Sequence, residues 1–321
     1  MSIQNFSLSL DQIEFFGTDL ARPESILAES DGTLWISDQR GLMTRRDPDG
    51  TQTLLGAIGH EPNGLAMDSH GRFYNANIGT GKIYSVERDG TAEVILEELN
   101  GQPLGAVNFV FVDSRDRLWI SVSTREPIWF MAASAPRPDG YVILLDENGP
   151  RIVADGIYFP NEVRLNADES YLYVAETMKG RMVRYPVLSA EGNLGDQELF
   201  GPDGLGEAGY VDGFAFDEEG NVWVTTVLRN GLVIITADGQ HTHTVFEDPV
   251  TAALANAQAK VDSQALAPED MFACVGPRIQ FPTSVTFCGP DRKTVLMGSL
   301  AMPHLLKFQS PVAGLPMRHW K

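Results

Sequence analysis

The stretch VDGFAFDEEGNVWVTT, residues 211–226, shows the unit from which this chain is built. A polar residue, Asp212, precedes a short apolar run, an acidic turn follows, and a second apolar run is centred on Trp223. The same arrangement occurs six times, and its polar position is occupied in turn by Glu24, Asn63, Asn108, Asn161, Asp212 and Thr283. A repeat of this length predicts a solenoid or a propeller.

Each unit has the pattern of β-strands rather than of helices. The second apolar runs are TLWISD (33–38), RFYNAN (72–77), RLWISV (117–122), YLYVAE (171–176), NVWVTT (221–226) and TVLMGS (294–299). They alternate in steps of two and are rich in Val, Ile, Trp and Tyr, which is typical of strands. Pairs that form tight hairpin turns recur at Asp49-Gly50, Asp89-Gly90, Asn148-Gly149 and Asp238-Gly239. We therefore expect an all-β fold, a six-bladed β-propeller with about four antiparallel strands in each blade.

The two ends of the chain are expected to complete one blade together. After Met302-Pro303 there is room for only one or two strands, and residues 6–16 can supply the missing outer strand. This closure leaves neither end as an exposed sheet edge. The continuous repeat predicts a single domain over residues 1–321. Insertions at 125–140 and 248–281 interrupt the repeat, and they are expected to form either lids or decoration of the outer rim.

Composition narrows the choice of partners. Acidic side chains outnumber basic ones, 43 to 24, for a formal charge of −19. This excess disfavours a nucleic-acid partner, because such binding depends on Lys and Arg. We find no apolar stretch long enough for a membrane span and no leader pattern at the start, and the two cysteines, Cys274 and Cys288, give no disulfide framework. We expect a cytoplasmic protein that acts on a small molecule, and its oligomeric state stays open.

The repeated polar residues predict a metal site. Six blades around an axis would bring their equivalent loop residues to one point, where oxygen atoms would gather from Glu24, Asn108, Asn161 and Asp212. Neighbouring carboxylates repel one another unless a cation balances their charge. An all-oxygen set indicates one hard divalent cation, with calcium expected and magnesium, manganese or zinc as alternatives. The competing interpretation is that such side chains only bond to loop backbone, and we favour it for Asn63 and Thr283.

Three motifs resemble those of the senescence-marker-protein (regucalcin)/gluconolactonase family of six-bladed propellers. They are Pro23-Glu24 before the first pair of runs, FPNEV (159–163) before YLYVAET (171–177), and VDGFAFDEEGNVW (211–223). The resemblance covers nearly the whole chain, and the last two motifs are fairly specific. It implies metal-dependent opening of a lactone.

The resemblance also implies roles for individual residues. Glu24, Asn161 and Asp212 match the metal ligands of the family, and Asp212 is the implied general base. Asn108 matches an asparagine that lies beside the metal and contacts substrate, and that is itself a ligand in related phosphotriesterase-like propellers. Glu126 falls where some sugar-lactone-cleaving members hold a substrate hydroxyl.

Two positions beside Asn108 depart from the family pattern. Sugar lactonases carry an arginine where this chain has Ala106, and an aspartate where it has Phe109. A sugar lactone would lose one polar contact here and would meet a bulkier, apolar neighbour. We therefore expect a less polar lactone or ester, with Arg125 as a candidate replacement for the missing charge.

Metal-assisted hydrolysis of a lactone is the leading hypothesis. His60, three residues before Asn63, is placed to contact substrate or shuttle a proton, or it is an ordinary loop histidine. The second hypothesis is phosphotriester hydrolysis, or an isomerase or lyase reaction, at the same cation. The third is a non-catalytic propeller that binds calcium or a partner protein, since the fold alone does not set the function.

Overall fold

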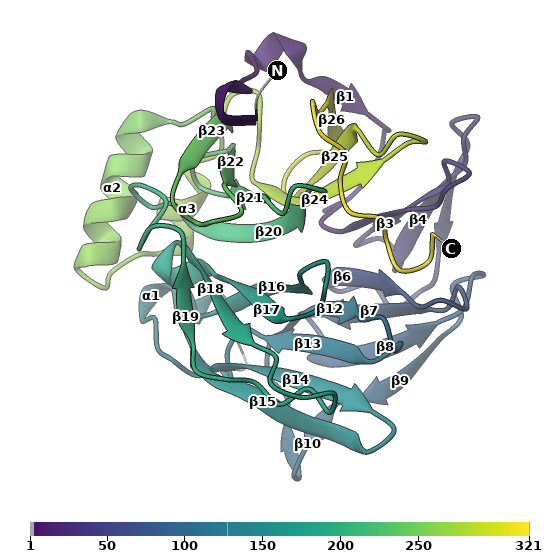
Figure 1. Cartoon of the computed structure of the whole chain (residues 1–321). Coiled ribbons are helices and arrows are strands. Elements are labelled where there is room, and N and C mark those ends of the chain that lie inside the picture. Colours follow the sequence, from purple (N-terminus) through teal and green to yellow (C-terminus); the bar gives the residue numbers. More distant parts are fainter. Residues whose placement is uncertain (1–2, 127, 321) are drawn as a thin grey trace.

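The computed structural model describes residues 3–126 and 128–320, and its main body is six four-stranded antiparallel sheets (Figure 1). The sheets surround a common axis, because the innermost strands of neighbouring sheets contact one another around the whole circle. The expectation of a six-bladed β-propeller is therefore confirmed. We call the face where the innermost strands begin the upper face, and the face where they end the lower face.

The first three blades follow in chain order, each from its innermost strand outward. Blade one holds β2 (Ile26–Ala28), β3 (Leu34–Ser37), β4 (Met43–Arg46) and β5 (Gln52–Leu55). Blade two holds β6 (Pro62–Met67), β7 (Phe73–Asn77), β8 (Lys82–Val86) and β9 (Ala92–Leu96). Blade three holds β12 (Val107–Val112), β13 (Leu118–Val122), β14 (Gly140–Asp146) and β15 (Gly149–Ile157). A short hairpin of β10 (Glu98–Leu99) and β11 (Gln102–Pro103) separates blades two and three.

The remaining blades continue the same order. Blade four holds β16 (Pro160–Leu165), β17 (Tyr171–Glu176), β18 (Arg181–Pro186) and β19 (Glu198–Phe200). Blade five holds β20 (Val211–Phe216), β21 (Val222–Thr226), β22 (Gly231–Ile235) and β23 (Thr242–Phe246). Blade six holds β24 (Pro282–Cys288), β25 (Thr294–Ser299) and β26 (Leu305–Gln309). Short 3-10 helices lie at Ile3–Asn5, Leu10–Gln12 and Thr177–Lys179.

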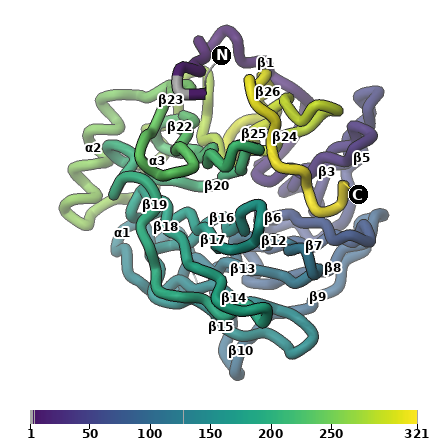
Figure 2. The backbone as a smooth tube through the Cα atoms, viewed as in Figure 1, coloured from purple at the N-terminus to yellow at the C-terminus, as the bar shows by residue number. Residues whose placement is uncertain are grey.

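The N-terminal strand completes blade six, as the sequence predicted. Strand β1 (Glu14–Phe16) pairs antiparallel with β26, with Phe15 opposite Leu306 (Figure 2). On the inner side of the same blade, Thr286 Oγ1 of β24 donates to the Ile26 carbonyl of β2 at 2.8 Å. The pairing of β1 with β26 and the bond from Thr286 both join the end of the chain to its beginning, so they close the circle of blades.

The hydrophobic core lies between blades. The repeated tryptophans are fully buried and face the next sheet: Trp35 of blade one lies 4.6 Å, centroid to centroid, from Phe73 of blade two. Trp223 of blade five lies 5.2 Å from Phe287 of blade six. Because each blade covers its neighbour, inner strands such as β6 and β13 are buried on both faces, whereas the outermost strands β5, β9 and β19 keep exposed residues.

The two insertions lie together on the upper side. The first contains α1 (Met131–Ser134), and the second contains α2 (Thr251–Asp262) and α3 (Pro268–Phe272). Ser134 Oγ donates to the Leu266 carbonyl at 2.6 Å, which joins the insertions directly. The apolar side chains of both form one cluster with residues from blades four, five and six. Within the described part of the chain, no helix has the length and apolar character needed to cross a membrane.

Candidate metal centre

The six repeated polar residues lie where the innermost strands begin. In five blades the pairing of the first two strands shifts beside this residue, between Pro62 and Leu65, Val107 and Phe109, Pro160 and Val163, Val211 and Phe214, and Pro282 and Val285. Such bulges re-aim a side chain out of the regular ladder. They place one polar residue from each blade at the upper end of the axis. We call this set the axial cluster: Glu24, Asn63, Asn108, Asn161, Asp212 and Thr283.

Hydrogen bonds across blades tie the axial cluster together. Thr283 Oγ1 donates to the Glu24 carbonyl at 3.0 Å. Arg22 Nη1 donates to Asn63 Oδ1 at 2.7 Å, and Asn63 Nδ2 donates to Asn108 Oδ1 at 2.8 Å. The sequence analysis favoured backbone bonding for Asn63 and Thr283; Thr283 does bond to backbone, whereas Asn63 links two side chains of the cluster.

Two acceptor oxygens of the axial cluster are buried without a hydrogen-bond donor from the described residues. They are Glu24 Oε2 and Asn161 Oδ1. Arg22 Nη2 lies 2.8 Å from Glu24 Oε2, but this ion pair lacks hydrogen-bond geometry. Glu24, Asn161 and Asp212 are only 6%, 5% and 6% exposed. A buried acceptor without a partner costs free energy, and a cation at this point would satisfy both oxygens.

The carboxyl groups of the axial cluster are difficult to ionise without a cation. Burial raises the pKa of Glu24 to about 7, although Arg22 opposes the shift. Burial also raises the pKa of Asp212 well above its usual value, and the charges of Glu24 and Glu162 raise it further. An amide contact from Asn161 partly offsets this shift. The effect of the Glu24 charge on Asp212 indicates that the two carboxyl groups lie close enough to repel each other.

The donor set fits a hard divalent cation. Among residues 3–126 and 128–320, no three His, Cys, Asp or Glu side chains gather as metal ligands. A centre here would therefore depend on the amide oxygen of Asn161 together with the carboxylates of Glu24 and Asp212. The Oδ1 atom of Asn108 already accepts from Asn63, which leaves one of its two lone pairs for a cation. The ligand roles of these residues stay predictions.

A buried ion pair below the axial cluster was not predicted. Glu162 directly follows Asn161, is 3% exposed, and pairs with Arg164 at 2.7 Å. Its Oε2 atom also accepts from the Phe214 backbone N–H at 3.2 Å. A Cβ at Gly213 would lie 2.3 Å from the Thr283 carbonyl oxygen and 2.4 Å from Glu162 Oε1, and the backbone contact requires glycine at that place. In the sequence, the signal for this pair was two charged residues, Glu162 and Arg164, at alternate positions of an innermost strand. Alternate residues of a strand lie on the same face of the sheet.

The other predicted site residues lie apart from this network. Arg125 is bound to Asp155 at 3.0 Å and stacks over the Tyr141 ring of β14. Glu126 pairs with Arg137 at 2.6 Å, within the same insertion. His60 is exposed and has a positive φ of 58°. None of these printed contacts is with a member of the axial cluster, and the proposed substrate roles of the three residues stay predictions.

The first insertion reaches over the upper face. Trp129 Nε1 donates to Glu61 Oε2 at 2.9 Å, and the indole lies 6.4 Å from the Phe159 ring. Glu61 comes directly before blade two and Phe159 directly before blade four, so the indole spans the top of blade three. Pro127, within the predicted insertion, lies outside the described residues. The first insertion therefore lies over the upper face, and its role as a lid stays a prediction.

The fold and the axial cluster define a six-bladed propeller with a buried oxygen-donor site at one end of its axis. Residues 88–257 match the model of the family described as SMP-30/gluconolactonase/LRE-like region, and the chain belongs to this family. The resemblance noted in the sequence is therefore confirmed.

Individual relatives are more distant. A 6-deoxy-6-sulfogluconolactonase from Pseudomonas putida is 26% identical over 210 residues, which cover 64% of this chain and 68% of the relative. A gluconolactonase structure from Xanthomonas campestris has a TM-score of 0.67 at 21% identity, covering 92% of this chain and 88% of that one. The calcium-binding protein regucalcin from Agrobacterium tumefaciens has a TM-score of 0.70 at 17% identity, covering 98% of both chains. The two structures share the fold with this protein.

Proposed function

We propose that this protein is a metal-dependent hydrolase that opens a lactone, or a related ester, at the axial cluster. The observation that carries the proposal is the pair of buried acceptor oxygens without donors, Glu24 Oε2 and Asn161 Oδ1, beside the carboxylate of Asp212. The names of the distant relatives, gluconolactonases and a calcium-binding regucalcin, support the reaction class and the ion. Calcium is the proposed ion, because the donor atoms are all oxygens.

The residues divide the chemistry among them. Glu24, Asn161 and Asp212 would hold the cation, which polarises the substrate carbonyl and stabilises the charge that develops on its oxygen. Asp212 is the candidate base that takes a proton from the attacking water. Water adds to the carbonyl carbon, the ring C–O bond breaks, and the product is a hydroxy acid.

Asn108 is held in one orientation at the axial cluster, where it is the candidate residue for contact with the substrate. Its Oδ1 atom accepts from Asn63 at 2.8 Å and its Nδ2 atom donates to Ser123 Oγ at 2.9 Å. Ser123 in turn donates to the Pro160 carbonyl at 2.7 Å. A side chain fixed at both ends keeps its orientation, and pre-organised contacts of this kind position a reacting group.

The surroundings favour a substrate that is less polar than a sugar lactone. Phe159, Tyr210 and Phe281 belong to one apolar cluster beneath the two insertions, and Trp129 packs against it. Ala106 and Phe109, the two positions that depart from the family pattern, are both buried and apolar. Sites of this kind use apolar walls for most of their contact and a few polar groups for orientation.

A panel of lactones, esters and phosphotriesters tests the proposal. Turnover is measured with the calcium-loaded protein and again after chelation. Hydrolysis of a lactone that disappears with chelator and returns with calcium supports the proposal. Metal-dependent cleavage of phosphotriesters alone would replace it with the second hypothesis, and calcium binding without turnover across the panel would indicate a binding protein.

A further inference from the structure

Directly above the axial cluster lies a second ring of repeat-equivalent residues. Each is two positions before an axial residue, and we call the set the upper ring: Arg22, Glu61, Ala106, Phe159, Tyr210 and Phe281. In blades two to six, the carbonyl of the upper-ring residue accepts a hydrogen bond from the residue that follows the second strand. These donors are Ile78, Ser123, Thr177, Val227 and Leu300. The shared bond shows that the positions are structurally equivalent.

Arg22 occupies the same position in blade one. It directly precedes a proline and has a left-handed φ of 52°, as do Phe159 with 59° and Phe281 with 49°. Three blades therefore turn the chain into the axis in the same way. The carbonyl of Arg22 differs from the other five, because it accepts from the Glu24 N–H at 2.9 Å.

The upper ring has an apolar half and a charged half. Phe159, Tyr210 and Phe281 come from the consecutive blades four, five and six and form part of one buried cluster. Burial raises the pKa of Tyr210 to about 12, so its hydroxyl stays protonated, and that hydroxyl has no hydrogen-bond partner among the described residues. Arg22 and Glu61 come from the adjacent blades one and two, and Ala106 of blade three is the smallest member.

Arg22 is the cation of the charged half. Its guanidinium donates to Asn63 Oδ1 at 2.7 Å and forms an ion pair with Glu24 Oε2 at 2.8 Å, so only one of its five N–H groups makes a hydrogen bond among the described residues. Its side chain is 11% exposed, so its stem is packed while its charge stays at the site. The carboxylate of Glu61 is engaged by the Trp129 indole at 2.9 Å. Asn63 links Arg22 to Asn108, the residue proposed to contact substrate.

We propose that Arg22 binds an anionic group of the substrate, and that the substrate is an aryl or other apolar lactone carrying a carboxylate. The apolar part would lie against Phe159, Tyr210 and Phe281, and the carboxylate would pair with the guanidinium on the opposite side of the upper ring. A planar guanidinium suits a carboxylate because it donates two parallel hydrogen bonds. Ala106 of blade three carries no charge, and Arg22 of blade one would supply the positive charge of the upper ring instead. This inference rests on the proposed lactonase function.

The first measurement compares two lactones on the calcium-loaded protein. They are dihydrocoumarin and a dihydrocoumarin that carries a carboxylate on its aromatic ring. We expect the carboxylated lactone to have the higher kcat/KM, and Arg22→Gln to lower the ratio of the two values by about tenfold, since losing one charge-assisted contact is an effect of this order. Arg22→Lys, which keeps the charge, should retain part of the preference. Arg125→Gln tests the alternative predicted from the sequence, that Arg125 supplies the charge, and under the present inference the ratio should not change in that variant. Arg292→Gln, at an arginine that pairs with Glu218 on the surface, is the matched control.

The second measurement separates substrate recognition from catalysis. Calorimetry compares benzoate with benzamide on the calcium-loaded wild type and on Arg22→Gln, and the preference for benzoate should fall in the variant. Calcium titration of Arg22→Gln should show binding at least as tight as in the wild type, because an internal cation has been removed from Glu24. If neither lactone is hydrolysed, the proposed function fails while the benzoate comparison still tests Arg22. An unchanged anion preference in Arg22→Gln, or its loss in Arg125→Gln instead, would overturn the inference.

Discussion

The two ends of the propeller axis use similar residues for opposite purposes. At the upper end, each blade contributes one polar side chain, and two of the acceptor atoms, Glu24 Oε2 and Asn161 Oδ1, lack donors among the described residues. At the lower end, four blades place an acidic residue six positions before an aromatic residue of the second strand, and the acid accepts a hydrogen bond from that aromatic. The pairs are Glu29 with Trp35, Asp68 with Tyr74, Asp113 with Trp119, and Asp217 with Trp223, at 2.7, 3.1, 2.9 and 3.0 Å.

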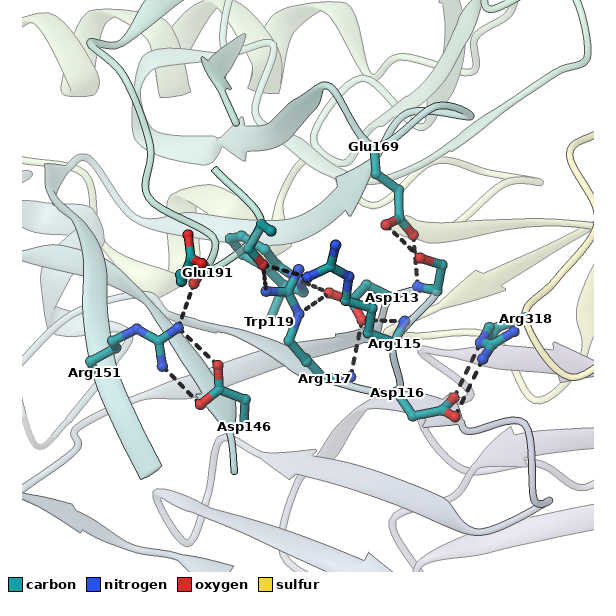
Figure 3. A network of polar contacts seen from close by, with 12 residues as sticks. Asp113, Arg115, Asp116, Arg117, Trp119, Asp146, Arg151, Glu169, Glu191 and Arg318 are labelled. Carbon is teal, nitrogen blue, oxygen red and sulfur yellow. Dashed lines mark hydrogen bonds and ion pairs between the residues drawn. The ribbon is translucent and has the colours of Figure 1, made fainter. Parts of the chain in front are cut away.

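Asp113 shows how completely a lower-face carboxylate is satisfied (Figure 3). It accepts from the backbone N–H groups of Arg115 and Arg117 at 2.9 and 3.0 Å. It also accepts from the Arg117 side chain at 2.7 Å and from Trp119 at 2.9 Å. Both arginines then donate to the Ala190 carbonyl of blade four, which links neighbouring blades. A buried carboxylate with this many donors stabilises the fold without a metal.

The lower end is also covered by the chain itself. Leu315 N–H donates to the Phe216 carbonyl at 3.0 Å, and Arg318 pairs with Asp116 at 3.1 Å (Figure 3). A cavity of about 240 Å³ remains between this C-terminal segment and the ends of the innermost strands. The difference between the ends separates acidic repeat positions that have their donors, and so stabilise the fold, from those whose donors are missing, which are the candidates for a functional role.

The largest effect is expected from Asp212→Ala at the upper end. It should lower lactone turnover by about 10³-fold, or about 4 kcal/mol of activation free energy, because it removes a proposed ligand and base. The metal-free variant should be at least as stable as the wild type, since a buried charge beside Glu24 has been removed. Kinetics and urea unfolding measure the two effects. Full turnover in this variant would end the proposed role of the axial cluster.

Asp217→Ala tests the lower end in the same blade. Asp217 is fully buried and accepts from Glu219, from Asn221 and from Trp223. Leaving these donors without a partner should lower the unfolding free energy by about 3 kcal/mol. Turnover per folded molecule should stay near the wild-type value. Asp238→Ala, an exposed hairpin residue of the same blade, is the control and should change stability little.

Calcium should stabilise the protein through the upper end alone. At a concentration 100 times the dissociation constant, a ligand that binds only the folded state adds about 2.7 kcal/mol. Melting curves with chelator and with calcium should therefore differ for the wild type and for Asp217→Ala, but not for Asp212→Ala. Equal shifts in all three proteins would place the calcium site away from the axial cluster.

Substrate preference should be a smaller effect. Alkyl or aryl lactones should have a kcat/KM at least about tenfold above that of gluconolactone, because one methylene in an apolar pocket is worth about 1–3 kcal/mol. Replacing Trp129 with Ala removes an apolar contact with Phe159. This change should reduce the ratio of kcat/KM for apolar lactones to kcat/KM for gluconolactone. A clear preference for gluconolactone would show that the apolar residues of the upper ring do not contact the substrate.

The smallest effect concerns His319 at the lower end. Its Nε2 atom bonds to the Ala28 carbonyl at 2.8 Å. Burial lowers the pKa of His319, while the charge of Glu29 raises this pKa and the charge of Arg88 lowers it. Because folding favours the neutral imidazole, its contribution to stability is present above the unfolded pKa of about 6.5 and is lost as pH falls below that value. Urea unfolding at about pH 8 and about pH 5.5 should show this loss, and His319→Gln should reduce it.

Much of the fold could be predicted from the sequence alone. The alternation of apolar residues and the repeated turns are local patterns, so they predict strands, hairpins and the six blades without tertiary information. The register of the repeat also identified all six members of the axial cluster. The same register contained the upper ring, two positions earlier, but Arg22, Glu61 and Tyr210 carry no recognisable motif.

Only the tertiary structure decided which of these groups are satisfied. Arg22 bonds to Asn63, which is 41 residues away in the sequence, and Thr283 bonds to the Glu24 carbonyl, which is 259 residues away. Desolvation of Glu24 and Asp212 likewise depends on neighbouring blades that are distant in sequence. A short sequence pattern reports the type and spacing of polar groups, whereas the free energy of a buried charge depends on every donor and charge that surrounds it in space. For this reason the sequence by itself determined the propeller and its polar positions, and only the closed ring of blades separated the unsatisfied upper end from the satisfied lower one.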